Sequence, residues 1–277
     1  MEAPLDYRHK IIDGMATGET RYPFPKPPGS FTGPIVDLEM SKLRSGLSMA
    51  HGFDISTITT TFCDALLGTA IEAFHEDMLP LPFDIVLFNF GGIVKDKSIA
   101  VCDLVVKSYH GFTIQQIIRV DNAWLIMPWA TCIYTGKNLD KGGVVINKLE
   151  FASEHKLVDA NLGQATHSAQ RVLQSLVCLE TKHVRITDEA APENLNKARE
   201  KRGACPISGH KIVTIDTSSA VVEMSDRSGT HASPRLHWRR GHVRRLPDGN
   251  KTKVKPCLVG DPAAARVSQE WRARAHA

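Results

Sequence analysis

The chain has 277 residues, of which 42% are hydrophobic and 23% charged, and its formal net charge is +4. This composition excludes a largely disordered protein and is typical of a globular chain with one large core or two smaller ones. The longest apolar run, residues 123–130, is far shorter than the roughly 20 residues of a membrane-spanning helix.

The first residues, Met-Glu-Ala-Pro-Leu-Asp-Tyr-Arg, carry an acid where a secretory signal would carry basic and then apolar residues. Six cysteines lie singly along the chain, without a Cys-x-x-Cys pair. We therefore expect buried, reduced thiols and no zinc or redox site. Together these features predict a cytoplasmic protein without a metal or another cofactor.

Residues 1–35 contain six of the fifteen prolines. Because proline fixes φ and lacks an N–H group, we expect an extended, mostly helix-free arm. Two helices are expected next. The second is marked by residues at the spacing of one buried helical face: Phe62, Ala65, Leu66, Thr69, Ala70, Ala73 and Phe74.

Runs of β-branched and aromatic residues dominate from Leu81 onward. They cover residues 83–90, 99–107, 112–120 and 124–134, with short polar turns between them. Closely spaced runs of this kind are typical of an antiparallel sheet. We interpret Trp124 and Trp129 as core residues, because no basic cluster flanks them as a base-stacking site would require.

Helical periodicity returns at 157–180, and a short helix is expected over 192–202, with proline near its start and glycine after its end. The basic residues of the short helix either balance its dipole or extend an anion-binding surface. Strands are expected over 211–216 and 220–224.

No internal repeat and no clear linker divides the chain. The sequence therefore predicts an α+β fold, in which an antiparallel sheet is packed with helices and a basic β-hairpin lies near the carboxy terminus. The expected units are the arm at 1–35, a single domain at 36–265 with a fallback boundary near 150, and a basic tail at 266–277.

The most unusual stretch is 231–255, which holds eight Lys or Arg residues against one acid, Asp248, and so carries a charge of +7. The rest of the chain therefore sums to −3. A slightly acidic scaffold with one strongly basic strip indicates a surface for an anionic partner.

Alternation predicts that this strip forms a β-hairpin. His237 and Arg239 share one face of a strand, and Trp238 falls on the other. Residues 247–250 have turn chemistry, and lysines alternate with less polar residues over 251–258, as the return strand of a hairpin should.

Gly241 predicts a bulge in the first strand of this hairpin, because glycine inside a strand often marks one. A bulge would shift the alternation by one residue. His242 and Arg244 would then join His237 and Arg239, so that two imidazoles and two guanidinium groups share one face.

Such a face suits phosphate, because guanidinium groups bind phosphate bidentately and lysines add point charges. We therefore expect nucleic acid, either RNA or DNA, as the partner. The residues predicted to bind it are Arg235, Arg239, Arg240, Arg244, Arg245, Lys251, Lys253 and Lys255.

Two histidines among arginines are also what metal-independent RNA cleavage requires, and His237 and His242 are the candidate acid/base pair. A zinc site that adds His231 to these two is disfavoured, because the neighbouring arginines repel a dication. The alternative without a binding function is a solvated hairpin whose charges protect an exposed edge.

Three segments resemble proteins of tailed bacteriophages and prophages. They are Leu81-Pro-Phe83 before a strand, Leu-Asn-Lys-Ala-Arg-Glu-Lys-Arg-Gly at 195–203, and the carboxy-terminal His-x-Ser-Pro-Arg-x-His-x-Arg-Arg-Gly-His-x-Arg-Arg-Leu at 231–246 with Val-Lys-Pro-x-Leu-Val-Gly-Asp at 254–261. The resemblance implies a phage-type protein in a bacterial cytoplasm and transfers no catalytic residue.

The sequence leaves two hypotheses of function. The first is a phage-type nucleic-acid-binding protein whose basic hairpin contacts phosphates and which, in one version, cleaves RNA without a metal. The alternative is a phage-encoded interaction protein that inhibits or redirects a host protein. Salt dependence does not separate the two hypotheses, because both interactions depend on charge. Competition does, because unlabelled RNA or DNA should displace a labelled oligonucleotide only if the protein binds nucleic acid.

Overall fold

The computed structural model describes residues 7–21, 34–55, 60–75, 78–94, 97–108, 111–120, 123–134, 143–148, 157–215, 237–239 and 241–259. Their helices are α1 (Arg8–Thr17), α2 (Pro34–Met49), α3 (Thr60–His75), α4 (Leu157–Leu179) and α5 (Glu193–Glu200). The helix expected around residues 62–74 and those expected over 157–180 and 192–202 are confirmed, as is a helix before the first of these.

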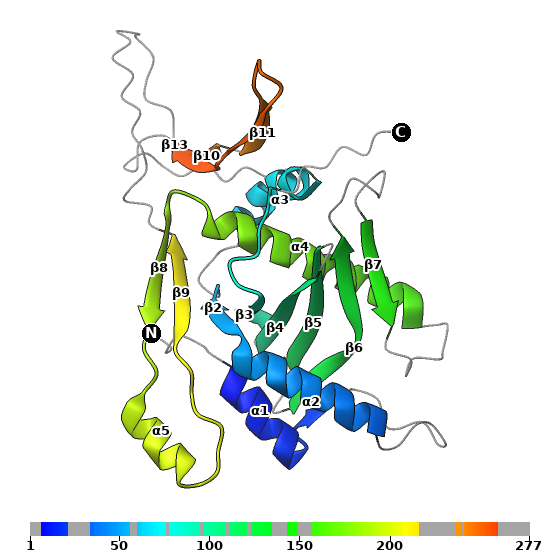
Figure 1. The fold of residues 1–277 in the computed structure, drawn as a ribbon, viewed down its shortest axis with the longest axis vertical. Coiled ribbons are helices and arrows are strands. Elements are labelled where there is room, and N and C mark those ends of the chain that lie inside the picture. The colour runs from blue at the N-terminus through cyan, green and yellow to red at the C-terminus, as the bar shows by residue number, and fades with distance from the viewer. Residues whose placement is uncertain are drawn as a thin grey trace.

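Nine strands form the main sheet of the described residues. They are β1 (Thr20–Arg21), β2 (His51–Asp54), β3 (Ile85–Val94), β4 (Lys97–Ser108), β5 (Gly111–Val120), β6 (Ala123–Tyr134), β7 (Gly143–Lys148), β8 (Val184–Glu189) and β9 (His210–Ile215). Their order is β1-β6-β5-β4-β3-β2-β9-β8, and β7 also pairs with β6 (Figure 1). Strands from both sides of residue 150 share this sheet.

The four long strands β3 to β6 pair antiparallel in chain order, as the sequence predicts. The sheet as a whole is mixed, however, because β2 runs parallel to both β3 and β9, and β1 runs parallel to β6. The fold is therefore α+β with a mostly antiparallel, mixed sheet. The strand expected over 220–224 lies outside the described residues.

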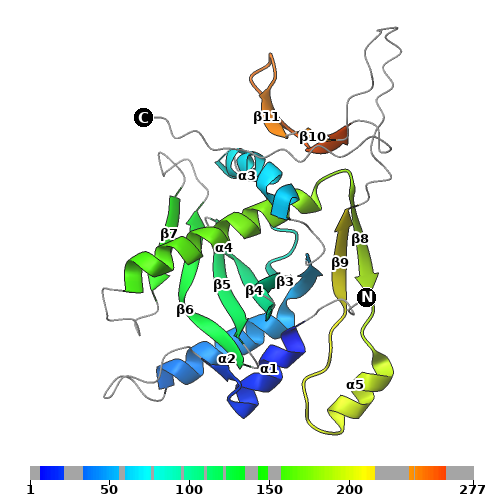
Figure 2. The same cartoon turned by 180° about the vertical axis from the view of Figure 1, so that it is seen from behind.

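Helices cover both faces of the sheet, and the central strands are accordingly apolar on both sides. Val86 and Phe88 of β3 face the layer of α3 and α4, whereas Leu87 between them faces the layer of α1 and α2. Figure 1 shows α1 and α2 in front of the strands, and Figure 2 shows α4 in front of them from behind. Trp124 is buried in the second layer, as expected.

The helix-free arm predicted for residues 1–35 is wrong in its described part. Residues 8–17 form α1, which buries Ile11 and Ile12 against the sheet, and β1 pairs with β6. The six prolines lie on either side of residues 7–21, so the helical segment itself contains none. Residues 22–33 and the predicted tail at 266–277 lie outside the described residues.

A buried ion pair fastens α4 to the sheet. Asp103 of β4 is fully buried and accepts hydrogen bonds from Ser168 (2.8 Å) and from the Nη2 of Arg171 (2.9 Å). The Arg171 guanidinium also lies over the ring of Phe90. A buried carboxylate needs such partners, because desolvation penalises the charged form. Among the described helices, none is both long enough and apolar enough to cross a membrane.

Candidate functional site

The predicted basic hairpin is present as two pairs of short strands. Strand β10 (His237–Arg239) pairs antiparallel with β13 (Cys257–Val259), and β11 (His242–Arg245) pairs antiparallel with β12 (Lys251–Val254). The ribbon lies above α3 at one end of the molecule and bends between the two pairs (Figure 1). Arg235, Arg240 and His231 lie outside the described residues.

The turn between β11 and β12 has the predicted chemistry. Gly249 has a φ of 82°, a left-handed conformation that glycine adopts without strain. The backbone N–H and the side-chain amide of Asn250 both donate to Asp248, at 3.0 and 2.9 Å. These hydrogen bonds lower the pKa of the Asp248 carboxyl below its ordinary value of 3.8.

The predicted bulge at Gly241 is wrong. Arg239 pairs with Cys257 and His242 pairs with Val254, so two residues intervene on each strand and neither strand carries an extra one. The four predicted side chains are therefore not gathered on one face by a shift of register.

Gly241 is required for a different reason. A Cβ at this position would lie 2.6 Å from the carbonyl oxygen of Val254 and 2.8 Å from the Cδ of Pro256. The Gly241 carbonyl accepts a hydrogen bond of 2.7 Å from the buried hydroxyl of Thr69, on α3. The glycine thus marks where the hairpin strands approach each other closely and dock onto the helix.

Lys253 provides a second attachment of the hairpin. Its ammonium group pairs with the Glu180 carboxylate after α4 and donates to the carbonyl of Met78 at 2.7 Å. Its side chain is only 12% exposed. Lys253 was predicted to bind nucleic acid, and in the structure its charge is occupied in holding β12 against the body of the protein.

The remaining described basic residues of the hairpin point to solvent. Arg239, Arg244, Arg245 and Lys255 are exposed, and no hydrogen bond or ion pair holds their side chains among the described residues. His242 is likewise exposed, and Lys251 is exposed. For His237 the structure gives the backbone pairing alone. These four exposed cations, which lie on both faces of the hairpin and have no carboxylate partner among the described residues, make the hairpin electropositive, and we call them together the hairpin surface.

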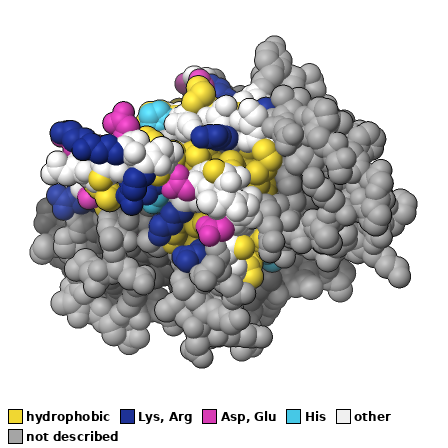
Figure 3. Space-filling model, turned by 90° about the horizontal axis from the view of Figure 1, so that it is seen from below, with side chains coloured by type: hydrophobic (Ala, Val, Ile, Leu, Met, Phe, Trp, Pro, Cys, Tyr) yellow, Lys and Arg dark blue, Asp and Glu magenta, His cyan; other side chains and the backbone are white. Residues whose placement is uncertain are grey.

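The basic residues of α5 do not extend the hairpin surface. Both views place α5 at the opposite end of the molecule from the hairpin (Figures 1 and 2). Arg199 of α5 pairs with Asp13, and Glu193 and Glu200 lie beside the helix's other basic residues. Viewed from this end, basic and acidic side chains of the described residues are intermixed (Figure 3).

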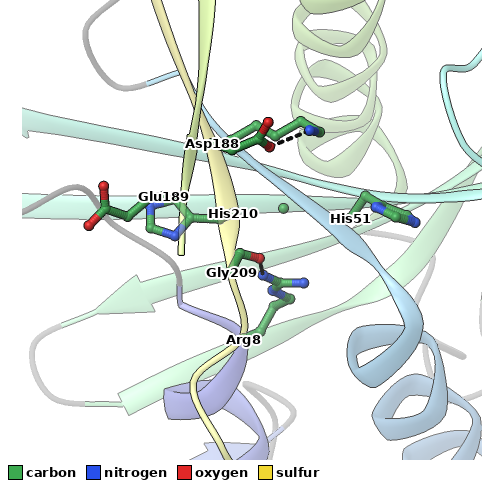
Figure 4. A pocket seen from close by; sticks show the side chains of 8 residues that line it. Arg8, His51, Asp188, Glu189, Gly209 and His210 are labelled. Atoms are coloured by element: carbon green, nitrogen blue, oxygen red, sulfur yellow. Dashed lines mark hydrogen bonds and ion pairs between the residues drawn. The ribbon is translucent and has the colours of Figure 1, made fainter. Parts of the chain in front are cut away.

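A small cavity lies beside α1, where β2 and β9 begin and β8 ends (Figure 4). Its volume is about 160 Å³. The buried Arg8 donates to the carbonyls of Ala50 and of Gly209, the latter at 2.6 Å. Gly52 leaves room for this guanidinium, because a Cβ there would lie 3.1 to 3.3 Å from it. Asp188 pairs with Lys211 across the cavity mouth.

The charged groups that line this cavity are mostly held by the hydrogen bonds of Arg8 and by the ion pair of Asp188 and Lys211. The cavity therefore holds the nearby strand termini in place and presents little unpaired charge to a partner. The Nε2 atom of His210 is buried there and has no hydrogen-bond partner among the described residues. Sequence reasoning missed the cavity because its residues come from four separate segments, around residues 8, 51, 188 and 210. It missed Thr69 and Glu180 as anchors for the same reason, since they lie 172 and 73 positions from the hairpin residues that they bind.

Comparison with known proteins identifies the chain at the level of family. No curated protein and no solved structure matches it. Residues 57–259 match a family model described as AcrVA2-like, the anti-CRISPR type V subtype A2 family. The match includes α3, α4 and every described strand of the hairpin, and it agrees with the resemblance to phage proteins. The chain belongs to the AcrVA2-like family of anti-CRISPR proteins.

Proposed function

We propose that this protein protects a phage from a type V CRISPR defence by binding a component of that defence in the host bacterium. The family match over residues 57–259 carries the proposal. It favours the interaction protein over the nuclease among the two hypotheses drawn from the sequence.

The hairpin surface is the proposed contact. Arg239, Arg244, Arg245 and Lys255 are exposed and unpaired among the described residues, so no internal ion pair has to be broken for them to bind a partner. The anchors at Thr69 and at Lys253 fix the hairpin backbone before binding, which lowers the ordering cost. The partner's contact region is accordingly expected to be acidic.

The test is the plating efficiency of a phage on bacteria whose type V system targets it, with and without this protein expressed. The key variant is Arg239→Ala/Arg244→Ala/Arg245→Ala. Each charged contact contributes roughly 1.5–3 kcal/mol, so losing three is expected to abolish protection. The matched control, Lys197→Ala/Lys201→Ala/Arg202→Ala at the end of α5 and just after it, removes the same charge from the opposite end and is expected to protect fully.

Two results would contradict the proposal. If the wild-type protein leaves plating on the immune strain unchanged, it does not act against the type V system supplied. If both triple variants protect equally, the hairpin surface is not the contact. Equal amounts of folded protein, verified by blotting and circular dichroism, are required for either comparison.

The second candidate function is nucleic-acid binding by the same surface, and one observation favours it. No described side chain of the hairpin is at once large, apolar and exposed. Protein interfaces usually concentrate their energy in such residues, whereas phosphate backbones are bound by cations alone. Binding of labelled RNA and single-stranded DNA should then fall steeply with salt and with the hairpin triple variant.

The nuclease version of this candidate has its own test. His237→Ala and His242→Ala should each abolish cleavage of RNA in EDTA while leaving binding nearly intact. The missing bulge removes the geometric reason to place both imidazoles on one face, so the hypothesis now depends on this measurement. Intact RNA and single-stranded DNA after incubation with the wild-type protein would eliminate it.

A further inference from the structure

Strand β8 is an open edge of the main sheet. It pairs with β9 on one side and with no other described strand on the other. Residues 185–189 are all exposed, and Ile186 has 42% of its surface accessible. An uncovered edge presents unpaired N–H and C=O groups to which another strand can add.

The charges of β8 are separated along the strand. Arg185 lies near its start, and Asp188 and Glu189 lie at its end. Asp188 is already neutralised by Lys211, directly opposite on β9. Arg185 and Glu189 carry unpaired side chains among the described residues, and Figure 4 shows the Glu189 carboxylate directed away from the Asp188–Lys211 pair.

We propose that β8 pairs antiparallel with β8 of a second copy of this chain, which joins the two sheets across a two-fold axis. Antiparallel pairing places the basic start of one strand beside the acidic end of the other. The strand is thus electrostatically complementary to itself, as an isologous interface requires.

Symmetry selects the register. A two-fold axis perpendicular to the sheet keeps each face on its own side, so opposed residues must both be odd or both be even. Arg185 therefore cannot oppose Asp188 of the second copy, but it can oppose Glu189. The register that achieves this is centred on Thr187 and forms the Arg185–Glu189 pair twice.

The remaining pairs of this register are also compatible. Ile186 opposes Asp188 of the second copy, whose charge is neutralised by its own Lys211, so the exposed isoleucine meets a balanced pair and not an isolated charge. The pairing involves few residues, so a concentration-dependent dimer is expected. The edge is distinct from the hairpin surface, and the inference does not rest on the proposed function.

The first experiment measures the mass of the full chain by light scattering over about a hundredfold range of concentration. The wild type is expected to reach twice the monomer mass. Arg185→Glu and Glu189→Arg each place like charges opposite one another and should remain monomeric. The double variant Arg185→Glu/Glu189→Arg restores both pairs and should dimerise again, whereas the charge-matched control Lys197→Glu on α5 should dimerise as the wild type does.

The second experiment tests the register. Opposed Cα atoms in an antiparallel pair lie roughly 4.5–5.5 Å apart, within the range of a disulfide. Thr187→Cys lies on the proposed axis and should form a disulfide-linked dimer under mild oxidation, beyond any seen for the wild type. Ile186→Cys lies off the axis and should not.

The outcomes decide the proposal. If the wild type stays monomeric over the whole concentration range, the proposal is overturned, and the β8 edge is then available for a strand of another protein. A dimer that survives both single charge reversals overturns it too, because the contact is then elsewhere. Linkage at residue 186 in place of 187 contradicts the register. Loss of phage protection has no bearing on any of these measurements.

Discussion

Gly241 occupies the closest approach between the hairpin strands and α3. Because its missing Cβ would lie 2.6 Å from the Val254 carbonyl oxygen, Gly241→Ala must push the strands apart or move the hairpin from Thr69. Overpacking of this kind costs roughly 1–3 kcal/mol. We expect the free energy of unfolding to fall by that amount in urea titrations.

Gly163 provides the matched control for this glycine. It is exposed on α4, and nothing lies within 4 Å of the position that a Cβ would occupy. Gly163→Ala should therefore stabilise the protein by roughly 0.5–1 kcal/mol, because alanine is the better helix former. Similar unfolding free energies for the two variants would show that Gly241 is not sterically required.

Lys253 and Lys255 are two residues apart but have different roles in the structure. Lys253 is held by Glu180 and Met78, whereas Lys255 is exposed and unpaired among the described residues. Lys253→Met should speed amide hydrogen exchange in β11 and β12, since roughly 1–3 kcal/mol of charged hydrogen bonding is lost. Lys255→Met should leave this exchange unchanged and weaken partner binding. Identical effects of both would contradict the anchoring role.

At the scale of elements, the Asp103 carboxylate adds an ion pair to the apolar packing that holds α4 against the sheet. Asp103→Ala leaves the Arg171 guanidinium and the Ser168 hydroxyl without their acceptor. Breaking a buried pair costs about 3 kcal/mol or more. The exposed pair of Asp84 and Lys107, 3.7 Å apart, is the control, and Lys107→Ala should cost less than about 1 kcal/mol. Equal losses of unfolding free energy would refute the distinction.

The elements that the sequence predicts correctly are those with a strong local signal. The helix α4 has a long apolar stripe, and β3 to β6 are runs of β-branched and aromatic residues. Strand β2 has four residues and forms only within the sheet, between β3 and β9, so nothing local marks it. The helix α1 was missed because prolines on either side of it dominated the composition of the whole segment.

In the hairpin, too, local features were predictable from the sequence and contacts with distant residues were not. Its strands and turn were predictable from alternation and from Asp-Gly-Asn, but the role of Gly241 depends on Thr69, 172 residues away. A register shift does occur in the sheet, between Gln115 and Ile117 of β5, opposite the part of β6 that contains Pro128. Proline has no N–H group to donate to a neighbouring strand. Pro128 therefore indicated an irregular strand more strongly than Gly241 did.

At the scale of the whole molecule, the charged ends have different compositions. The hairpin end presents cations without acidic partners among the described residues, whereas the α5 end intermixes both signs and fixes Arg199 with Asp13. The described part of the basic strip thus lies at one end of the molecule. Steering of an anionic partner is expected toward that end.

The α5 end contacts the core mainly through the partly buried Cys205 and through the bonds of Arg199 and Cys205 to Asp13. No residue of α5 is buried, and Glu189 pairs with His210 across its base. Deleting residues 191–208 and changing Ala190 to Asn would leave Asn-Gly209 as a two-residue turn, which suits a hairpin. The Gly209 carbonyl that binds Arg8 is retained.

We expect this deletion variant to unfold in one cooperative transition and to lose no more than about 1–2 kcal/mol, mainly through the broken Arg199–Asp13 pair and the Cys205 amide hydrogen bond to Asp13. Binding through the hairpin surface should be unchanged, because the deleted residues lie at the other end of the molecule. A broadened unfolding transition, or loss of phage protection by the deletion variant, would show that α5 belongs to the core or to the contact surface.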